Sequence, residues 1–275
     1  MLISPFSPLF FRPIKSYGIG CPYIQTFATS DRILIELIGE KDWHGQATVY
    51  AEPSHEPLFV IQFNTWEINR TTMLRFTVLA LTPGTYSVGI SGIGVSETFK
   101  VTNSELELAT TTLIQYSMKD NKSRMDGVFF IDGMQRFFDF RVPGGFKDSN
   151  WTFSVDNEQF VTADSDIIEL YAKESTQQKF TLGNSMGCPI WFGEMLNRIL
   201  CCSFVYFDGI RYCRKDSSVP EVTLLQDGIN SFVFNQSLQK VVNIDPAINL
   251  SHQIAMRRTS DTYRLAIPDI NRIAE

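Results

Sequence analysis

Residues 23–101 contain a regular succession of short apolar runs, and no other feature constrains the fold of this chain so strongly. Each run has five to eight residues rich in β-branched and aromatic side chains, and turn-forming stretches such as TSD, EPSHEP and LTPG separate the runs. In order, the runs are YIQTFA, RILIELIG, QATVYAE, LFVIQF, MLRFTVL, TYSVGI and ETFKV. About seven strands at this spacing predict an immunoglobulin-like β-sandwich, which we assign to residues 1–105.

The run RILIELI shows the alternation expected of a strand in such a sandwich. Ile33, Ile35 and Leu37 fall on one face of an extended chain, and the residues between them fall on the other.

Residues 106–240 are also rich in strand-like runs, and we assign them to a second, β-rich domain. The expected strands are TLIQYSM, GVFFID, QRFFDFRV, WTFSVD, IIELYAKE and QKFTL. Three Asp-Gly pairs between apolar runs predict hairpin turns, because both turn positions require a positive φ. They are Asp132-Gly133, Asp208-Gly209 and Asp227-Gly228, and the PGG stretch at residues 143–145 predicts a fourth turn. Residues 241–275 have weaker periodicity and are assigned to a C-terminal arm that becomes ordered against a neighbouring subunit.

One helix is predicted in this second domain, near residues 189–202. Its sequence, PIWFGEMLNRILCC, places apolar residues on a single wide face and starts with a proline that suits the first turn. The apolar positions are Trp191, Phe192, Met195, Leu196, Ile199 and Leu200. The expected fold class is therefore mainly β, with an N-terminal immunoglobulin-like sandwich followed by a β-rich domain with one amphipathic helix.

Charge and hydropathy exclude several classes of function. The 275 residues carry a net charge of -6, with a pI near 5.2, and a protein that binds nucleic acid depends on clustered Lys and Arg. No window of eighteen uninterrupted apolar residues occurs, so no membrane span is expected. The N-terminus has three prolines in its first thirteen positions and no basic segment before an apolar one, so no signal peptide is expected. We expect the chain to be made and kept in a cytoplasm.

The stretch GNSMG, residues 183–187, matches the G-x-S-x-G nucleophile elbow of serine hydrolases. A strand-like run precedes it and the predicted helix follows it. A hydrolase using Ser185 would need an acid, Asp208 or Asp227, and then His252. However, the chain lacks the strand–helix alternation of that fold, and both acids belong to predicted turns. We therefore interpret GNSMG as a glycine-rich connection, with Asn184 or Ser185 capping the turn.

Candidate metal ligands do not form a pattern typical of a metal site. Neither H-x-H nor H-x3-H spacing occurs, and His44 and His55 lie on predicted loops of the first domain. Cys188, Cys201, Cys202 and Cys213 allow a zinc interpretation but lack a C-x2-C pair, so buried, unliganded thiols are favoured. Asp148, Asp156, Asp164 and Asp166 miss the calcium-loop spacing. No catalytic residue, metal site or cofactor is predicted.

Two tryptophans leave a second class of function open. Trp43 lies in the charged turn GEKDWHG, and Trp66 follows the run LFVIQF. A tryptophan ring exposed on a β-sandwich offers an apolar face to a sugar. The chain could therefore be a carbohydrate-binding module that contacts a glycan on a host surface.

Several stretches of the second domain form a pattern of their own. They are Tyr116-Ser117, the VPGGF turn at residues 142–146, the LGNSMGCPIWF segment at residues 182–192, and the CSFVYFDGIRY hairpin at residues 202–212. Together they resemble a group of tail-associated proteins from phages and prophages of Bacteroidetes. The resemblance covers roughly residues 110–215. Met118 stands where that pattern has Asn, and Pro143 stands where it has a residue such as Glu.

The resemblance implies a virion structural protein, part of a bacteriophage or prophage tail or baseplate. No catalytic residue is attached to this group, so the resemblance implies that the chain is not an enzyme. It implies contacts with other copies of the chain and with neighbouring tail proteins. The expected location is the virion and, during assembly, the cytoplasm of the host bacterium. The alternatives are the glycan-binding module and the serine hydrolase using Ser185.

Overall fold

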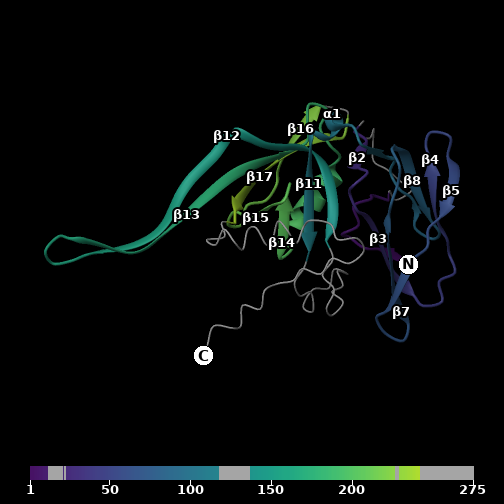
Figure 1. Cartoon of the computed structure of the whole chain (residues 1–275), viewed down its shortest axis with the longest axis horizontal. Coiled ribbons are helices and arrows are strands. Elements are labelled where there is room, and N and C mark those ends of the chain that lie inside the picture. Colours follow the sequence, from purple (N-terminus) through teal and green to yellow (C-terminus); the bar gives the residue numbers. More distant parts are fainter. Residues whose placement is uncertain (12–20, 22, 118–136, 227–228, 242–275) are drawn as a thin grey trace.

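The structure, a computed structural model, describes residues 1–11, 21, 23–117, 137–226 and 229–241. It is mainly β, as the sequence predicts, and its longest described strands lie beyond residue 110. Figure 1 shows three parts in a row: a sandwich, a barrel, and a long two-stranded ribbon that projects from the barrel. The predicted C-terminal arm, apart from Val241, lies outside the described residues.

The first part is an immunoglobulin-like sandwich of two sheets. One sheet has the order β1 (Leu2–Ile3), β3 (Ile33–Glu40), β7 (Thr72–Leu79) and β6 (Asn64–Glu67). The other has the order β2 (Gln25–Ala28), β10 (Phe99–Thr102), β8 (Gly84–Ile90), β4 (Ala47–Ala51) and β5 (Glu56–Val60), with β9 (Gly94–Val95) paired to β8. All pairs are antiparallel except β2 with β10. This division of the strands between two sheets is the one found in immunoglobulin domains.

The sandwich core is apolar and includes a tyrosine corner. Ile35 and Val88, from the two facing sheets, are both fully buried. The hydroxyl of Tyr86, at the start of β8, donates a hydrogen bond of 2.9 Å to the carbonyl of Thr82. This contact fixes the corner before the strand, as it does in immunoglobulin domains. Antibody domains have a cysteine two residues after that tyrosine, and here the position is Val88.

The second part is a closed, antiparallel β-barrel, which follows the short helix α1 (Glu105–Leu108). Its strands are β11 (Thr111–Ser117), β12 (Phe138–Val161), β13 (Ile167–Leu182), β14 (Phe204–Phe207), β15 (Ile210–Arg214) and β17 (Ser231–Lys240). The circuit runs β12-β11-β14-β15-β17-β13 and closes where β13 pairs with β12. A further strand, β16 (Glu221–Gln226), pairs with β17 beside β15. Closure removes the open edges of the barrel strands.

Helix α2 (Ile190–Ile199) covers the barrel and follows the predicted pattern. All six predicted apolar positions are buried, whereas Glu194 and Asn197 are exposed. Gly193 also faces the barrel, since a Cβ atom there would lie 2.3 Å from the ring of Phe234. The helix ends earlier than predicted, because Leu200 is its C-cap and Cys201 and Cys202 follow it.

Two turn predictions have different outcomes. Asp208 and Gly209 have φ values of 47° and 83° between β14 and β15, which confirms the predicted hairpin turn. The prediction of a turn at residues 143–145 is wrong, because they lie inside β12 where the strand passes from pairing with β11 to pairing with β13. Gly144 has a φ of 110°, and this local change of direction explains the glycines. The other two Asp-Gly pairs, and most of the expected strand GVFFID, lie outside the described residues.

Strand β3 joins the sandwich and the barrel into one packed body. Ile33, Ile35 and Leu37 share one face of the strand, as the alternation predicts, and this face lies in the sandwich core. Leu34, on the opposite face, lies in the barrel core, and Phe76 of β7 packs against the same core. Phe6, from the N-terminal segment, is fully buried there as well. The chain therefore has two hydrophobic cores with one strand contributing to both.

Substitution of Gly187 should destabilise the fold strongly. Its φ is 72°, and a Cβ atom would lie 2.1 Å from the Ser231 hydroxyl oxygen and 3.1 Å from the Phe232 backbone nitrogen. Strain and overpacking together predict a loss of about 2–5 kcal/mol for Gly187→Val, measured by urea denaturation. Ser185→Ala, at an exposed position of the same turn, is the control and should change the unfolding free energy by less than about 0.5 kcal/mol. Equal losses for the two variants would contradict this account.

Candidate assembly interface

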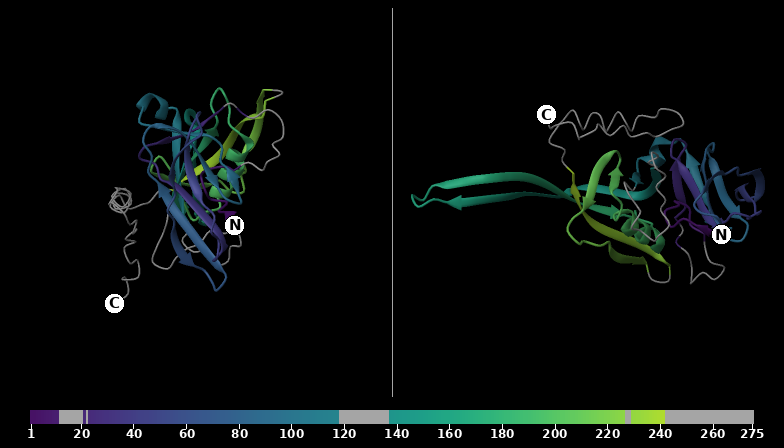
Figure 2. Two further views of the ribbon diagram at one scale, coloured as in Figure 1. Left: turned by 90° about the vertical axis from the view of Figure 1, so that its right-hand side faces the viewer. Right: turned by 90° about the horizontal axis from the view of Figure 1, so that it is seen from below.

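The most exposed part of the described chain is the outer part of the ribbon formed by β12 and β13. We call residues 151–176 the arm. Figures 1 and 2 show it extending away from both the barrel and the sandwich. All but four of its residues, Ser154, Thr162, Ser175 and Thr176, are exposed. A two-stranded ribbon without a third strand or a helix is only marginally stable in water, so the arm needs additional stabilising contacts.

One face of the inner half of the arm is polar and is bridged by side-chain hydrogen bonds. The hydroxyl oxygens of Ser154 and Ser175 lie 2.7 Å apart, and the Gln177 side-chain amide donates to Ser154 at 3.2 Å. Nearer the tip, the Tyr171 hydroxyl donates to Asp156 at 3.4 Å. These contacts connect the two strands and hold their register.

On the other face of the inner half, β12 presents apolar side chains that no other described residues cover, beside the polar residues Gln178, Thr176 and Glu174 of β13. Trp151, Phe153 and Val155 alternate along β12 and so share this face, where their exposed fractions are 42%, 77% and 61%. The rings of Trp151 and Phe153 lie 6.2 Å apart. Exposed apolar clusters of this kind are typical of interaction surfaces.

The tip of the arm is apolar on both faces. A register irregularity follows Glu158, and beyond it Phe160 pairs with Ile168 and Val161 pairs with Ile167. Because the two pairs are consecutive, they point to opposite faces, and all four side chains are at least 40% exposed. A partner that receives the tip can therefore contact it from both sides.

The arm also holds most of the net charge of the chain. Residues 151–176 contain six acidic side chains and one basic one, a net charge of −5, whereas the whole chain carries −6. The remaining residues are thus close to neutral. The arm is an acidic element with apolar patches.

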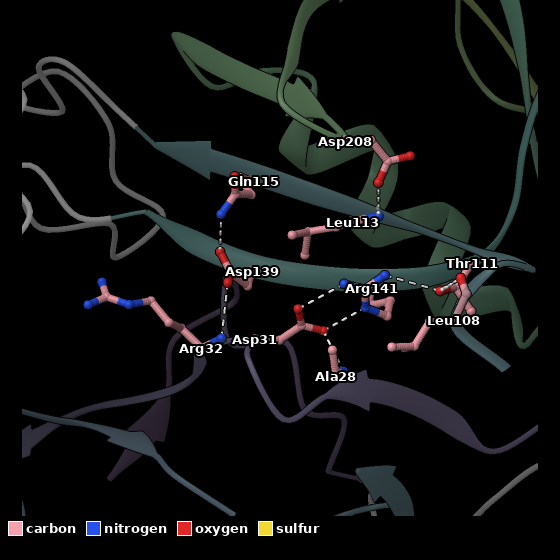
Figure 3. Close-up of polar contacts among 10 residues, drawn as sticks. All are labelled: Ala28, Asp31, Arg32, Leu108, Thr111, Leu113, Gln115, Asp139, Arg141 and Asp208. Atoms are coloured by element: carbon pink, nitrogen blue, oxygen red, sulfur yellow. Dashed lines mark hydrogen bonds and ion pairs between the residues drawn. The ribbon is translucent and has the colours of Figure 1, made fainter. Parts of the chain in front are cut away.

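A buried ion pair connects the sandwich to the barrel strand from which the arm extends. The Arg141 guanidinium, on β12, donates to both carboxylate oxygens of Asp31 at 2.6 and 2.9 Å (Figure 3). Asp31 also accepts from the Ala28 backbone nitrogen at 2.7 Å, and Arg141 donates to the Thr111 hydroxyl at 3.2 Å. The two charged side chains are only 12% and 1% exposed. This bidentate geometry fixes the orientation of β12 relative to the sandwich.

A second carboxylate crosses the same interface. Asp139 accepts from the Arg32 backbone nitrogen at 3.0 Å and from the Gln115 side-chain amide at 2.8 Å (Figure 3). Burial raises the pKa of Asp139, although these two hydrogen bonds act in the opposite direction. The carboxylate therefore ionises less readily in the folded chain than in water.

Ser185 is exposed, but its surroundings differ from those of a nucleophile elbow. Gly183 and Gly187 have the positive φ values expected of a glycine-rich connection, and the Asn184 side chain accepts from the Met186 backbone nitrogen, as an Asx turn does. Helix α2 begins at Ile190, so Ser185 does not open the helix as an elbow serine does. Ser185 lines an open depression of about 420 Å³ beside Gly144 and Lys147.

Of the three residues considered as catalytic partners of Ser185, only Asp208 lies within the described residues. The Asp208 carboxylate accepts from the Leu113 backbone nitrogen at 2.9 Å, which supports the hairpin turn (Figure 3). Asp227 and His252 lie outside the described residues.

The other candidate ligands are dispersed. His44 is exposed, and His55 lies in a turn next to Glu52, with its ring stacked on Tyr50. Cys188 is buried in the barrel core, and its burial raises the thiol pKa strongly, whereas Cys201 and Cys213 are exposed. Asp156, Asp164 and Asp166 are exposed on the arm. Within the described ranges, no group of three or more His, Cys, Asp or Glu side chains could hold a metal ion.

The two candidate sugar-binding tryptophans have different surroundings. Trp43 packs against the sandwich core, and the Arg75 guanidinium lies 5.4 Å from the centre of its ring. Trp66 lies on β6 and is 49% exposed. Of these two tryptophans, only Trp66 therefore has a half-exposed ring.

The comparisons with known proteins assign no family. No family model matches the chain, and no curated protein matches it. Among solved structures, a crystal structure of Dpr2 Ig1-Ig2 in complex with DIP-Theta Ig1-Ig3 is matched at 7% identity, with 81% of this chain and 88% of that chain covered. Its TM-score is 0.18, and a similarity at that level supports no conclusion. In the part of the chain that the structure describes, no helix is long and apolar enough to cross a membrane.

Breaking the interdomain ion pair should cost considerable stability. Arg141→Met would leave the buried Asp31 carboxylate without its counter-charge, which predicts a loss of about 3–5 kcal/mol in unfolding free energy. The double variant Asp31→Asn/Arg141→Met removes both charges, so its unfolding free energy should fall by less than that of the single variant. Urea denaturation of the three proteins tests this, and a single variant within about 1 kcal/mol of the original chain would contradict it.

Asp139 should make stability depend on pH in a defined direction. Since the folded-state pKa is raised, the folded chain holds the proton more tightly than the unfolded chain. The unfolding free energy of the original chain, relative to Asp139→Asn, should therefore rise as the pH falls from about 7 to about 4, near the ordinary pKa of Asp. Denaturation curves across this pH range measure the difference in unfolding free energy between the two proteins. If this difference falls as the pH falls, the pKa of Asp139 is not raised in the folded chain.

Proposed function

We propose that the chain is a structural subunit of a bacteriophage or prophage particle, located in the tail or baseplate, and that it assembles with copies of itself. The observation that carries this proposal is the arm, which exposes apolar side chains on an acidic ribbon beyond the folded body. In this proposal the chain acts in the virion and, during assembly, in the cytoplasm of the host bacterium.

The arm supports assembly because its exposed surface is costly unless a partner covers it. Nine large apolar side chains of residues 151–176 are at least 40% exposed, although the chain buries comparable side chains efficiently in both cores. They are Trp151, Phe153, Val155, Phe160, Val161, Ile167, Ile168, Leu170 and Tyr171. Covering them is favourable in proportion to the apolar area removed from water.

The rigidity of the body supports the same role. The arm strands continue into the barrel wall, and the barrel is fixed to the sandwich by the shared strand β3 and by the pair Arg141–Asp31. A contact made by the arm is therefore held in a defined direction relative to the whole body. Repeated assemblies need such a fixed angle between neighbours, because each contact recurs with the same geometry.

The resemblance to phage tail proteins supplies the biological setting of the proposal. The positions that carry it lie on barrel strands β11, β12, β14 and β15, on helix α2, and on the GNSMG connection. In this proposal they are structural positions that build the barrel, and Ser185 has no catalytic role.

Assembly should depend on the arm. Purified full-length protein should form rings or short tubes, seen by negative-stain electron microscopy and sized by light scattering. A variant in which an Asn-Gly turn replaces residues 151–176 should remain monomeric, because the body keeps its cores but loses the docking element. Its thermal unfolding, compared with that of the original chain, controls for loss of the fold. A full-length chain that stays monomeric at micromolar concentration would refute the assembly role.

The half-exposed Trp66 supports a second candidate, a module that binds host-surface glycans. In that case the chain should bind a glycan array as a monomer, and Trp66→Ala should reduce binding at least about tenfold. Trp43→Phe, at a ring that is partly covered by Arg75, is the matched control and should leave binding unchanged. Absence of glycan binding by the original chain would eliminate this candidate.

A further inference from the structure

Strand β16 is exposed in an unusual way for a strand attached to a barrel. It pairs with β17 on one edge, and no other described strand pairs with it. Val222, Leu224 and Leu225 are 56%, 48% and 43% exposed. The pairing with β17 is regular from Glu221 to Leu224, so side chains alternate between the two faces there, and residues 221–225 are all exposed. Both faces and one edge of β16 are therefore open. Open edges with apolar side chains are sites where another strand can add.

The arm of the same molecule is directed away from this strand. Its base is held where β13 pairs with β17 through residues 177–182, and the views in Figures 1 and 2 both show the tip at the far end of the molecule from the body. The tip therefore cannot contact its own β16 without rebuilding the barrel. A contact between the two elements must join different molecules.

Charge complements the apolar match between the arm and the region around β16. Residues 210–240, which include β15, β16 and β17, contain four basic side chains, Arg211, Arg214, Lys215 and Lys240, and three acidic ones, Asp216, Glu221 and Asp227, a net charge of +1. The arm carries −5 over residues 151–176. The difference in net charge between the two regions favours their encounter.

A competing apolar edge exists on the sandwich, but its charge disfavours the arm. Strand β5 is an edge strand with Leu58, Phe59 and Val60 each more than 40% exposed. However, residues 23–102 contain eight acidic and five basic side chains, a net charge of −3. The net charge of the sandwich therefore disfavours an acidic arm, whereas the net charge of residues 210–240 does not.

We propose that the arm of one copy docks on β16 and the adjoining wall of β15 and β17 of the next copy, with the tip residues Phe160 and Ile168 against Val222 and Leu224. This assignment deepens the assembly role proposed above and rests on it. Because the two surfaces differ, the contact is heterologous, and its repetition generates a ring if the rotation closes or a tube-like filament if it does not.

Two variants, each damaged on one side of the contact, test the pairing. The arm variant is Phe160→Asp/Ile168→Asp, and the wall variant is Val222→Asp/Leu224→Asp. All four positions are at least 40% exposed, so both variants should fold, which thermal unfolding checks. Each variant alone should be monomeric, with self-association weakened at least about a hundredfold in sedimentation equilibrium.

Mixing the two variants gives the decisive result. The wall variant retains an intact arm and the arm variant retains an intact wall, so an equimolar mixture should form a one-to-one heterodimer and nothing larger. Leu58→Asp/Val60→Asp, on β5, is the matched control and should assemble like the original chain. High salt should weaken the heterodimer, because the arm is acidic and the wall basic.

Other results overturn the proposal in distinguishable ways. If the β5 control is monomeric while the wall variant assembles, the arm docks on the sandwich. If the arm variant alone is defective and mixing restores nothing, the contact is arm to arm or involves another element. In both cases the original chain still assembles and the assembly role stands, whereas a monomeric original chain overturns both.

Discussion

Burial of strand β3 on both faces is the constraint on which the rest of the structure depends. Its odd-numbered residues fill the sandwich core, and Leu34 enters the barrel core from the other face. The two modules therefore cannot move apart without exposing apolar surface, as two domains joined only by a linker could. The bidentate pair Arg141–Asp31 adds orientation to this packing, since a guanidinium and a carboxylate match in only a few geometries.

Strands β12 and β13 each have two roles, and this explains their length. Near the body they form barrel wall, with Phe146 paired to Phe180 and Phe180 fully buried. Beyond residue 151 the same strands leave the barrel and become the arm. A continuous strand transmits a fixed direction from the core to the tip, which a flexible connection would not do. The positive φ of Gly144 lies near the point where β12 changes partner.

In the proposed assembly role, the rigid body and the uncovered arm together set the direction in which neighbouring copies meet. The GNSMG stretch is consistent with a structural role. Its two glycines and Asn184 form the turn that leads into α2, and the backbone of Cys188 then exchanges hydrogen bonds with that of Phe232 on β17. The proposed docking of the arm on β16 would cover apolar surface on both partners and would pair an acidic element with a basic wall. In the proposed assembly, every copy would use both its arm and its β16 wall, one for each neighbour.

The sequence by itself determined most local elements: each of the seven strand-like runs of residues 23–101 contains a strand, the apolar face of α2 is buried, and Asp208-Gly209 is a hairpin turn. The run LFVIQF is strand only up to Val60, and β6 was not predicted. Short-range periodicity and turn chemistry encode such features directly. Closure of the barrel, the double burial of β3 and the passage of residues 143–145 through a strand depend on which distant strands pair, and alternation along one strand does not reveal its neighbours.

The arm escaped prediction for the same reason. WTFSVD and IIELYAKE read as ordinary strands, and only the tertiary structure shows that nothing described covers them. Their dense acidic charge was the one available signal, because a strand with so many carboxylates is poorly suited to a core.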